Sequence, residues 1–330
     1  MFVFSQFRKL LAKAGFDSFL LGLIGMIVLA YFLPSPGVYE GAFSLSQIAN
    51  YGVSAIFFLY GLRLTPEKLK VGLSNWKLHT TIQLATFLLF PLLVLLGMFL
   101  FSNSGNYLAW LSVFYLASLP STVSSSVVMV SIAKGNIPAA IFNASISSLI
   151  GVFITPLWMG IFLSAGSSNY ELWGIIGKLT LQVIVPVTLG IVLNQYWGWF
   201  AEKHRKTLRY FDQTIILLIV YTSFCESFAH HMFAGYKLTD IALLGVSMIG
   251  LFFFIYGIIH LISKAMHFNR EDRITALFCG SKKSLVQGSV MAKVLFPDSA
   301  VAGVVLLSVM IYHALQLIAA SIIAQSMAKQ

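Results

Sequence analysis

The sequence predicts an all-α integral membrane protein, and two observations on composition and segment length lead to it. Of the 330 residues, 58% are hydrophobic and only 10% are charged, whereas a soluble domain carries about 25% charged residues. So few charges cannot cover a water-exposed surface, so lipid must be the surrounding solvent. In lipid the backbone satisfies its own hydrogen bonds as helices or closed barrels. The apolar stretches have the roughly 18–25-residue length of spanning helices, and ten-residue alternating segments typical of barrel strands are not seen.

Hydropathy along the chain predicts ten transmembrane helices joined by short connections that carry Gly, Pro, Asn and Ser. They cover approximately residues 16–33, 43–62, 78–100, 108–133, 137–163, 171–194, 211–229, 239–262, 272–296 and 300–326. No connection is long enough to separate two soluble domains, so we expect one membrane domain.

The distribution of Lys and Arg predicts the orientation of these helices. With the N-terminus in the cytoplasm, 16 of the 21 basic residues fall on the cytoplasmic side, as the positive-inside rule requires. The opposite side receives only Lys178, Lys237 and Lys293, while Lys282 and Lys283 lie inside the ninth span. Both termini are therefore expected in the cytoplasm.

The same distribution explains the net charge of +10 without nucleic-acid binding, because the basic residues occupy short loops rather than one patch. Cys225 and Cys279 lie in separate apolar spans and predict neither a disulfide framework nor a metal site. The seven His residues show no metal-ligand spacing. We expect no metal and no cofactor.

Ten spans divide into two units of five, residues 1–165 and 166–330. An odd number of spans forces the second unit to insert upside down, and inverted repeats with interrupted helices are typical of secondary transporters. The fourth span of each unit carries such an interruption near its middle. The first is Ser-Leu-Pro-Ser-Thr-Val-Ser-Ser-Ser at 118–126, and the second is Phe-Cys-Gly-Ser-Lys-Lys-Ser at 278–284.

Pro120 is the feature that interrupts the fourth span. Proline lacks an amide donor and clashes with the preceding turn, so it breaks or kinks a helix. Ser121 and Thr122 can bond the freed backbone groups or offer hydroxyl oxygens to a ligand. A simple proline kink with packed hydroxyls is the alternative, since both are common in membrane bundles. The matching interruption in the other unit favours a functional break.

Two adjacent lysines interrupt the ninth span. Each costs ~2.5–3.5 kcal/mol or more at bilayer depth, and they lie too far from either helix end to reach water. Adjacent helical positions differ by about 100°, so both face one direction only if the helix is broken, and Gly280 is a natural helix terminator. A structural ammonium that binds the exposed carbonyls of the broken helix is the alternative to a ligand contact.

Further polar side chains lie in the third, fifth and tenth spans, where hydrogen bonding between helices is the alternative to ligand contact. The complete set of candidate substrate- or ion-binding residues is Gln83, Pro120, Ser121, Thr122, Ser124, Asn143, Ser147, Ser148, Gly280, Ser281, Lys282, Lys283, Ser284 and His313.

Several motifs together resemble the bile acid:sodium symporter-like family, most of all its SBF-like branch. They are the segments 119–126, 133–136, 61–64, 147–156, 280–284 and 312–316. The resemblance covers nearly the whole chain. It implies a ten-helix fold in which spans 1, 2, 6 and 7 form a panel domain and spans 3–5 and 8–10 form a core domain. It also implies that broken spans 4 and 9 cross at the substrate and ion sites. We expect the protein to lie in the bacterial inner membrane.

The sequence departs from the sodium-coupled members of that family. They share a ninth-span Glu-x-Gly-x-Gln-Asn element whose Glu and Gln help to bind sodium. Aligned on Gly280, this chain has Phe278 at the Glu position and Lys282 and Lys283 at the Gln and Asn positions. A carboxylate is lost and two ammonium groups are gained, which should repel sodium. An ammonium driven toward its neutral form by desolvation could instead carry a proton, and one that stays charged could attract an anion.

We therefore expect a secondary transporter of a small organic anion or related solute that works by alternating access. Coupling to sodium is not expected, and coupling to protons is a possible replacement. A membrane regulator or interaction protein without transport activity is the alternative. A membrane enzyme is disfavoured because the sequence holds no HExxH or GxSxG motif, and the absence of a P-loop disfavours transport driven by ATP.

Overall fold

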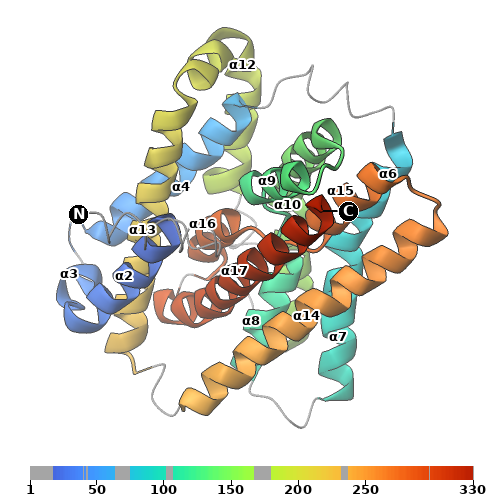
Figure 1. Cartoon of the computed structure of the whole chain (residues 1–330). Helices are drawn as coiled ribbons and strands as arrows, with labels where there is room; N and C mark the ends of the chain where they lie inside the picture. The colour runs from blue at the N-terminus through green and yellow to red at the C-terminus, as the bar shows by residue number, and fades with distance from the viewer. Residues whose placement is uncertain are drawn as a thin grey trace, which may run out of the picture.

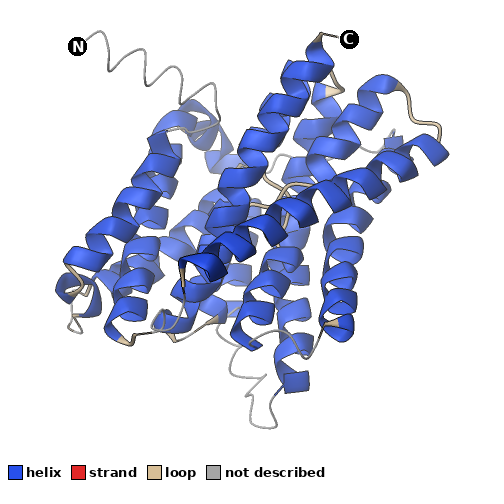
Figure 2. Cartoon of the chain, turned by 60° about the horizontal axis from the view of Figure 1, so that its bottom comes forward, coloured by secondary structure: helices blue, strands red, loops and turns tan. Residues whose placement is uncertain are grey.

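The computed structural model describes residues 18–39, 41, 44–63, 75–101, 107–166, 180–231, 237–296 and 298–329. These residues are helical apart from short connections, and among them no strand occurs (Figure 2). Five helices within this part of the chain are long and apolar enough to cross a membrane: Leu45–Leu62, Trp76–Leu100, Ile137–Leu163, Thr239–Ala265 and Ala300–Ala328. The predicted all-α class is confirmed for the described residues, and the five apolar helices agree with a membrane protein.

Helical residues occur within each of the ten predicted ranges. The helices are α2 (Ser18–Phe32), α3 (Ser35–Val38), α4 (Leu45–Leu62), α6 (Trp76–Leu84), the π-helical turn η2 (Ala85–Leu89), α7 (Phe90–Leu100), α8 (Tyr107–Ser118), α9 (Ser124–Ile132), α10 (Ile137–Gly166), the π-helical turn η4 (Thr180–Ile184), α12 (Val185–Lys203), α13 (Arg205–Ala229), α14 (Leu238–Ala265), α15 (Arg270–Gly280), α16 (Leu285–Leu295) and α17 (Ser299–Ala328). The inverted relation between the two halves stays a prediction, and the basic N-terminal residues lie outside the described part.

The helices pack as two groups, one beside the other (Figure 1). One group consists of α2, α3, α4, α12 and α13, and the other of α6 to α10 with α14 to α17. Helix α13 joins them, because it packs along α17 and α16 as well as against α2 and α4. Both interrupted segments, α8–α9 and α15–α16, therefore belong to the second group.

Helices α4 and α12 pack backbone to backbone within the first group. A Cβ atom added to Gly61 would overlap the carbonyl oxygen of Val187, and one added to Gly190 would overlap that of Phe58. Small residues at such crossings are how membrane helices approach closely. Glycine is needed here for space, and not for an unusual backbone angle.

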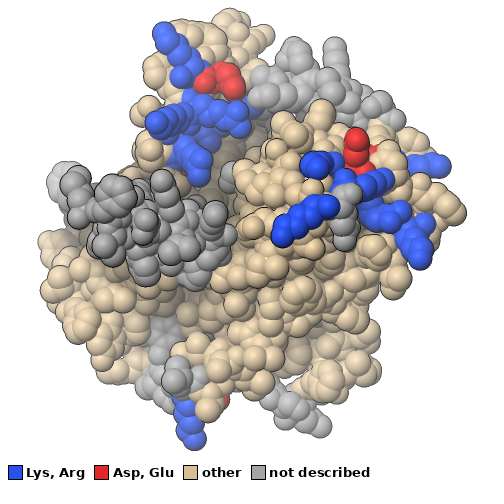
Figure 3. All heavy atoms as spheres, viewed as in Figure 1, with Lys and Arg blue, Asp and Glu red and all other residues tan. Residues whose placement is uncertain are grey.

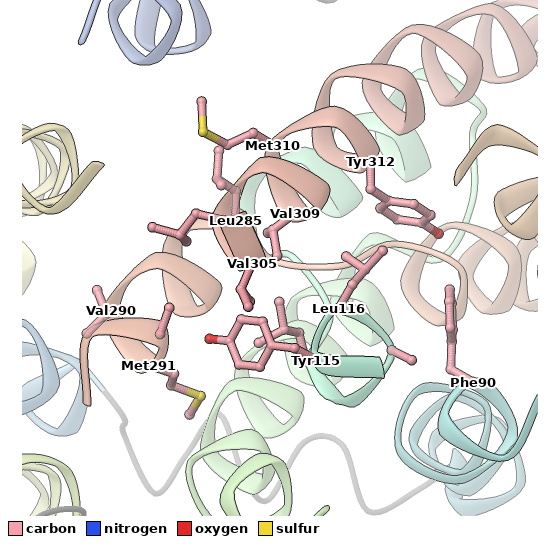
Figure 4. Packing of buried hydrophobic residues seen from close by; sticks show 14 of the residues in the cluster. Phe90, Tyr115, Leu116, Leu285, Val290, Met291, Val305, Val309, Met310 and Tyr312 are labelled. Atoms are coloured by element: carbon pink, nitrogen blue, oxygen red, sulfur yellow. The ribbon is translucent and has the colours of Figure 1, made fainter. Parts of the chain in front are cut away.

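Aromatic and aliphatic side chains fill the interior of the second group (Figure 4). Tyr115 is fully buried there, and its hydroxyl donates a 2.6 Å hydrogen bond to the carbonyl of Gly288. A buried tyrosine hydroxyl normally finds such a partner. The bond links α8 of the fourth span to α16 of the ninth span, so the two interrupted spans are also joined outside their breaks.

The third span changes its helical register next to Pro91. The amide of Phe90 bonds to the carbonyl of Ala85, one residue further than in an α-helix, and Pro91 has no amide to donate. The carbonyls of Thr86 and Phe87 are thereby left without a helical donor. Trp158 satisfies one of them, since its Nε1 donates to the Phe87 carbonyl at 2.7 Å. Irregular turns of this kind often mark functional sites in helices.

Surface Lys and Arg side chains gather in two places in the upper half of Figure 3. Over the α12–α13 corner they are the exposed Lys203, Arg205, Lys206 and Arg209, and a second set includes the exposed Lys264, Arg270 and Lys329. All seven belong to the predicted cytoplasmic set. The side of the membrane that they face stays a prediction.

Candidate functional site

Two helix breaks lie in direct contact inside the second helix group. Helix α8 ends at Ser118 and α9 begins at Ser124, while α15 ends at Gly280 and α16 begins at Leu285. The amide of Ser284 donates a 2.9 Å hydrogen bond to the carbonyl of Pro120. The two predicted breaks are confirmed, and so is the prediction that they meet. We call residues 119–123 and 281–284 the crossing.

Hydroxyls of the first break satisfy the exposed end of α15. The last carbonyls of a helix have no partner within the helix, and an unpaired buried carbonyl costs about 1–3 kcal/mol. Ser121 Oγ donates to the carbonyl of Cys279 at 2.6 Å, and Ser126 Oγ donates to that of Phe278 at 3.1 Å. Hydroxyls of the polar motif at 118–126 thus donate the hydrogen bonds that the last carbonyls of α15 lack within their own helix.

The first break is held from α10 as well. The amide of Ser121 donates to Ser147 Oγ at 3.0 Å, and Thr155 Oγ1 donates to the carbonyl of Ser118 at 2.8 Å. A Cβ added to Gly151 would overlap the Pro120 ring, so α10 lies closely against the proline. These contacts fix the path of the interrupted chain.

Lys283 is buried, and its ammonium binds three main-chain carbonyl oxygens. Lys283 Nζ donates to Thr86 at 2.8 Å, to Ala117 at 2.6 Å and to Leu119 at 2.7 Å. It also lies 4.2 Å from the centre of the Phe90 ring, within the range of a cation–π interaction. For Lys283 the described contacts match the alternative, a structural ammonium that binds exposed carbonyls, but these carbonyls belong to the third span, the end of α8 and the first break.

Lys282 is equally buried but points to a different neighbourhood. Its ammonium donates a 2.7 Å hydrogen bond to Ser125 Oγ, and Ser125 Oγ lies 3.1 Å from Thr122 Oγ1. His313 lies close enough to interact with Lys282 electrostatically. Ser125 and His313 are half-buried, so this group reaches toward the protein surface. Neither lysine takes part in the ion pairs seen among the described residues.

Helix α17 holds the second break in place through its side chains. Gln316 accepts a 2.9 Å hydrogen bond from the amide of Lys283 and donates a 2.8 Å bond to the carbonyl of the same residue. Tyr312 donates to the carbonyl of Ser281 at 2.8 Å, and His313 Nδ1 lies 3.0 Å from Gln316 Nε2. Ser281, Lys283 and Ser284 of the second break therefore all have main-chain partners from other segments.

Gly280 is the last residue of α15, but it does not end the helix in the predicted way. It does not adopt the left-handed conformation of a terminating glycine. A Cβ at this position would press on Ile259 Cδ1 at 2.9 Å and approach Ala85 at 3.5 Å. Gly280 lets α15 lie close to α14 and to the π-helical turn, and the termination itself follows from the pairing of residues 281–284 with Gln316 and Tyr312.

The structure brings most of the predicted residues together, but not all of them. Pro120, Ser121, Thr122, Ser147, Gly280, Ser281, Lys282, Lys283, Ser284 and His313 lie in or against the crossing. Ser148 contributes its carbonyl, which accepts from Gln287 at 3.1 Å, while its hydroxyl bonds within α10. The side chain of Ser124 lies outside the described part.

Gln83 and Asn143 form a separate polar group. Gln83 Nε2 donates to Asn143 Oδ1 at 3.2 Å, and Asn143 Nδ2 lies 2.7 Å from His79 Nδ1. These bonds join α6 to α10. For this pair the described contacts match the alternative of hydrogen bonding between helices.

Sequence reasoning missed several residues of the site. Ser125, which binds Lys282, lies inside the motif 119–126 but is not among the candidate residues. Gln316 is not among them either, although its bonds to Lys283 match the hydrogen bonding between helices expected of polar residues in the tenth span. Thr86 contributes a main-chain carbonyl, which no side-chain pattern shows. Pro91 was the available signal, because a proline inside an apolar span frees carbonyls about one turn before it.

Comparison with known proteins identifies the family of this chain. The model of the SBF-like CPA transporter family matches residues 17–329. The chain belongs to this family. A protein of Pseudomonas aeruginosa, PA2026, is 38% identical over 95% of this chain and 93% of its own. The protein named "Putative symporter YfeH" of Escherichia coli is 32% identical over 95% and 93%.

Animal proteins are also similar to this chain. "Sodium/bile acid cotransporter 7" of the rat is 29% identical over 96% of this chain and 93% of its own. The family and the names of these relatives point to a membrane transporter rather than an enzyme. Sodium and bile acid are part of the name of the rat protein only. In this chain, the feature that bears on a ligand is the crossing with Lys282 and Lys283.

Proposed function

We propose that this SBF-like protein is a secondary transporter that moves a small organic anion across the bacterial inner membrane by alternating access. In this proposal the halves 1–165 and 166–330 are inverted repeats, the first helix group is the panel, and the second group is the core that carries the solute. The observation that carries the proposal is the contact of two broken helices at a buried lysine. Irregular backbone is tolerated at membrane depth only inside protein or beside a water-filled cavity.

Lys282 supports the anionic class of the solute. Burying an ion costs several kcal/mol unless its surroundings replace the lost hydration. Lys283 has three carbonyls and an aromatic ring around its ammonium, but Lys282 has one hydroxyl partner, Ser125. An anion bound beside Lys282 would replace the hydration that this buried ammonium has lost. The half-buried Ser125 and His313 would meet the solute first.

Lys283 supports transport without sodium. Its ammonium already occupies the carbonyl oxygens that the two irregular spans expose, so a sodium ion has no free set of ligands there. The positive charge of both lysines would also repel a second cation at this distance. We propose that solute movement needs no sodium gradient, and that any coupling is to protons through Lys282.

The first experiment screens organic anions for thermal stabilisation of the purified protein in sodium and in choline buffers. The compounds tested are monocarboxylates, dicarboxylates and sulfonates. The best stabiliser is then followed as uptake into proteoliposomes by wild type, Lys282→Met and the control Lys264→Met, whose lysine is exposed on α14. We expect sodium-independent uptake that Lys282→Met abolishes and Lys264→Met keeps. Absence of stabilisation and uptake, or strict sodium dependence, would contradict the proposal.

A pH-sensitive dye inside the same vesicles tests the proton part. If Lys282 carries a proton, uptake changes internal pH, and Lys282→Gln removes that change. If Lys282 acts as a fixed charge, uptake leaves internal pH unchanged, and Lys282→Arg retains part of the activity.

The proposed orientation is tested by labelling single cysteines from outside the cell. A cysteine introduced at the end of α10, at Gly166, and one at the exposed Glu202 should react from opposite sides. Labelling of both positions from the same side would exclude ten spans with both termini in the cytoplasm.

A further inference from the structure

We propose that the carbonyl oxygens of Thr86, Ala117 and Leu119, together with the Phe90 ring, form a binding site for a small monovalent cation, and that the Lys283 ammonium is its permanently attached occupant. On this proposal a free alkylammonium ion can bind the same site once the Lys283 side chain is truncated. The site is independent of the solute and of the direction of transport.

The first argument is the number and kind of ligands. Three neutral main-chain oxygens lie 2.6–2.8 Å from Lys283 Nζ, one for each proton of an ammonium group. No carboxylate takes part, since Lys283 forms none of the ion pairs among the described residues. A ligand set of neutral dipoles suits a single positive charge, because each carbonyl replaces part of its hydration.

The second argument is the origin of these carbonyls. Thr86 lies in the π-helical turn, where Phe90 bonds to Ala85 instead and Pro91 offers no amide. Ala117 lies in the last turn of α8, and its helical donor, the amide of Ser121, bonds to Ser147 instead. Two independent irregularities thus release oxygens toward one point.

The third argument is the position of the cation relative to the fold. The ammonium lies between the third span, the end of α8 and the chain leading into α16, so it joins three segments that are distant in sequence. Phe90 supports it from another side, with its ring centre 4.2 Å from Nζ. The main chain of Lys283 is fixed separately by Gln316. Truncation of the side chain would therefore leave a preformed set of ligands around an empty volume.

The test is chemical rescue of Lys283→Ala. The substitution removes three carbons and the amine, which is the heavy-atom content of n-propylammonium. In detergent, Lys283→Ala should unfold at a lower temperature than wild type, and propylammonium chloride should raise its Tm in a saturable manner by roughly 5 °C or more. Wild type and Lys282→Ala should not respond, because in both proteins Lys283 fills the site.

Neutral 1-propanol and the bulky tetramethylammonium ion are the matched probes. Propanol has nearly the same shape as propylammonium without the charge, and tetramethylammonium has the charge without N–H donors. Neither should raise the Tm of Lys283→Ala. An equal response to propanol, or no response to propylammonium, would overturn the proposal.

A second experiment leaves Lys283 intact, in case Lys283→Ala does not fold. Phe90 is replaced by phenylalanine analogues with one, two and three ring fluorines, which weaken the attraction of the ring for a cation while nearly keeping its shape. The Tm should fall stepwise with fluorine number at position 90, and should not do so at the buried Phe57, which packs against Tyr60. The same response at both positions would overturn the assignment of Phe90 to the cation site.

Discussion

Lys282 and Lys283 are neighbours in the same helix break and are buried to the same degree, 0% and 1% exposed, yet their surroundings differ. The ammonium of Lys283 has three carbonyl partners and an aromatic ring, all from the protein interior. The ammonium of Lys282 has one hydroxyl partner, on a half-buried serine. Adjacent side chains of the second break point into separate environments, and the carbonyls that Lys283 binds come from the third span, the end of α8 and the first break.

The difference separates a structural charge from a charge available to a ligand. A buried ion whose hydration is replaced by fixed protein dipoles contributes to the fold, and removing it leaves several polar groups unpaired. A buried ion that is only partly compensated gains from binding a counter-ion. The four predictions below test this division, beginning with the largest expected effect.

Lys283→Met should destabilise the protein far more than Lys282→Met. The first change leaves the carbonyls of Thr86, Ala117 and Leu119 without a donor, at an expected cost of about 3–5 kcal/mol. The second removes one bond to a hydroxyl that keeps Thr122 as a neighbour, at about 1 kcal/mol or less. Thermal unfolding of both variants in the same detergent measures the difference. Equal losses of stability would contradict the division between a structural lysine and a lysine available to a ligand.

Arginine should replace one lysine and not the other. The guanidinium of Lys283→Arg is too large for three oxygens that converge within 2.8 Å of a single nitrogen, so we expect a loss of about 2–4 kcal/mol. Lys282→Arg keeps the charge beside a half-buried group and should fold nearly as well as wild type. The yield of monodisperse protein and its Tm report this, and a stable Lys283→Arg would refute a closed ligand set.

Gln316→Ala should have an intermediate effect on stability. It removes both hydrogen bonds to the main chain of Lys283, and a loss of about 2 kcal/mol is expected for two buried groups left unpaired. Gln325→Ala, near the end of the same helix, is the control, because Gln325 bonds only to Ser321 among the described contacts. If both variants lose equal stability, α17 does not hold the second break in the proposed way.

Ser125→Ala should have the smallest effect on stability but should weaken solute binding. One hydroxyl hydrogen bond is worth about 0.5–1.5 kcal/mol, which corresponds to an affinity loss of roughly 2–10-fold. Ser145→Ala is the matched change, because Ser145 is half-buried like Ser125 and bonds only within its own helix among the described contacts. Affinity measured by concentration-dependent thermal stabilisation should separate the two variants, and identical affinities would exclude Ser125 from the solute site.

Much of this arrangement followed from the sequence, and the remainder depended on backbone geometry. The breaks were predictable because Pro120 lacks a donor and because two adjacent lysines are costly within an unbroken apolar helix. Which lysine binds the carbonyls was not predictable, since adjacent side chains differ only in direction. The role of Thr86 was hidden because it acts through its main chain, in a turn whose register changes before Pro91. Gln83 and Asn143 looked like site residues by polarity alone, but lie in a separate group.

The most direct test of the division between the lysines is a high-resolution structure with the stabilising anion bound in sodium-free buffer. The account predicts that oxygen atoms of the anion lie within hydrogen-bond distance of Lys282 Nζ and Ser125 Oγ. It also predicts that Lys283 Nζ remains bonded to the carbonyls of Thr86, Ala117 and Leu119. An anion bound at Lys283, or a free cation occupying those three carbonyls, would contradict it.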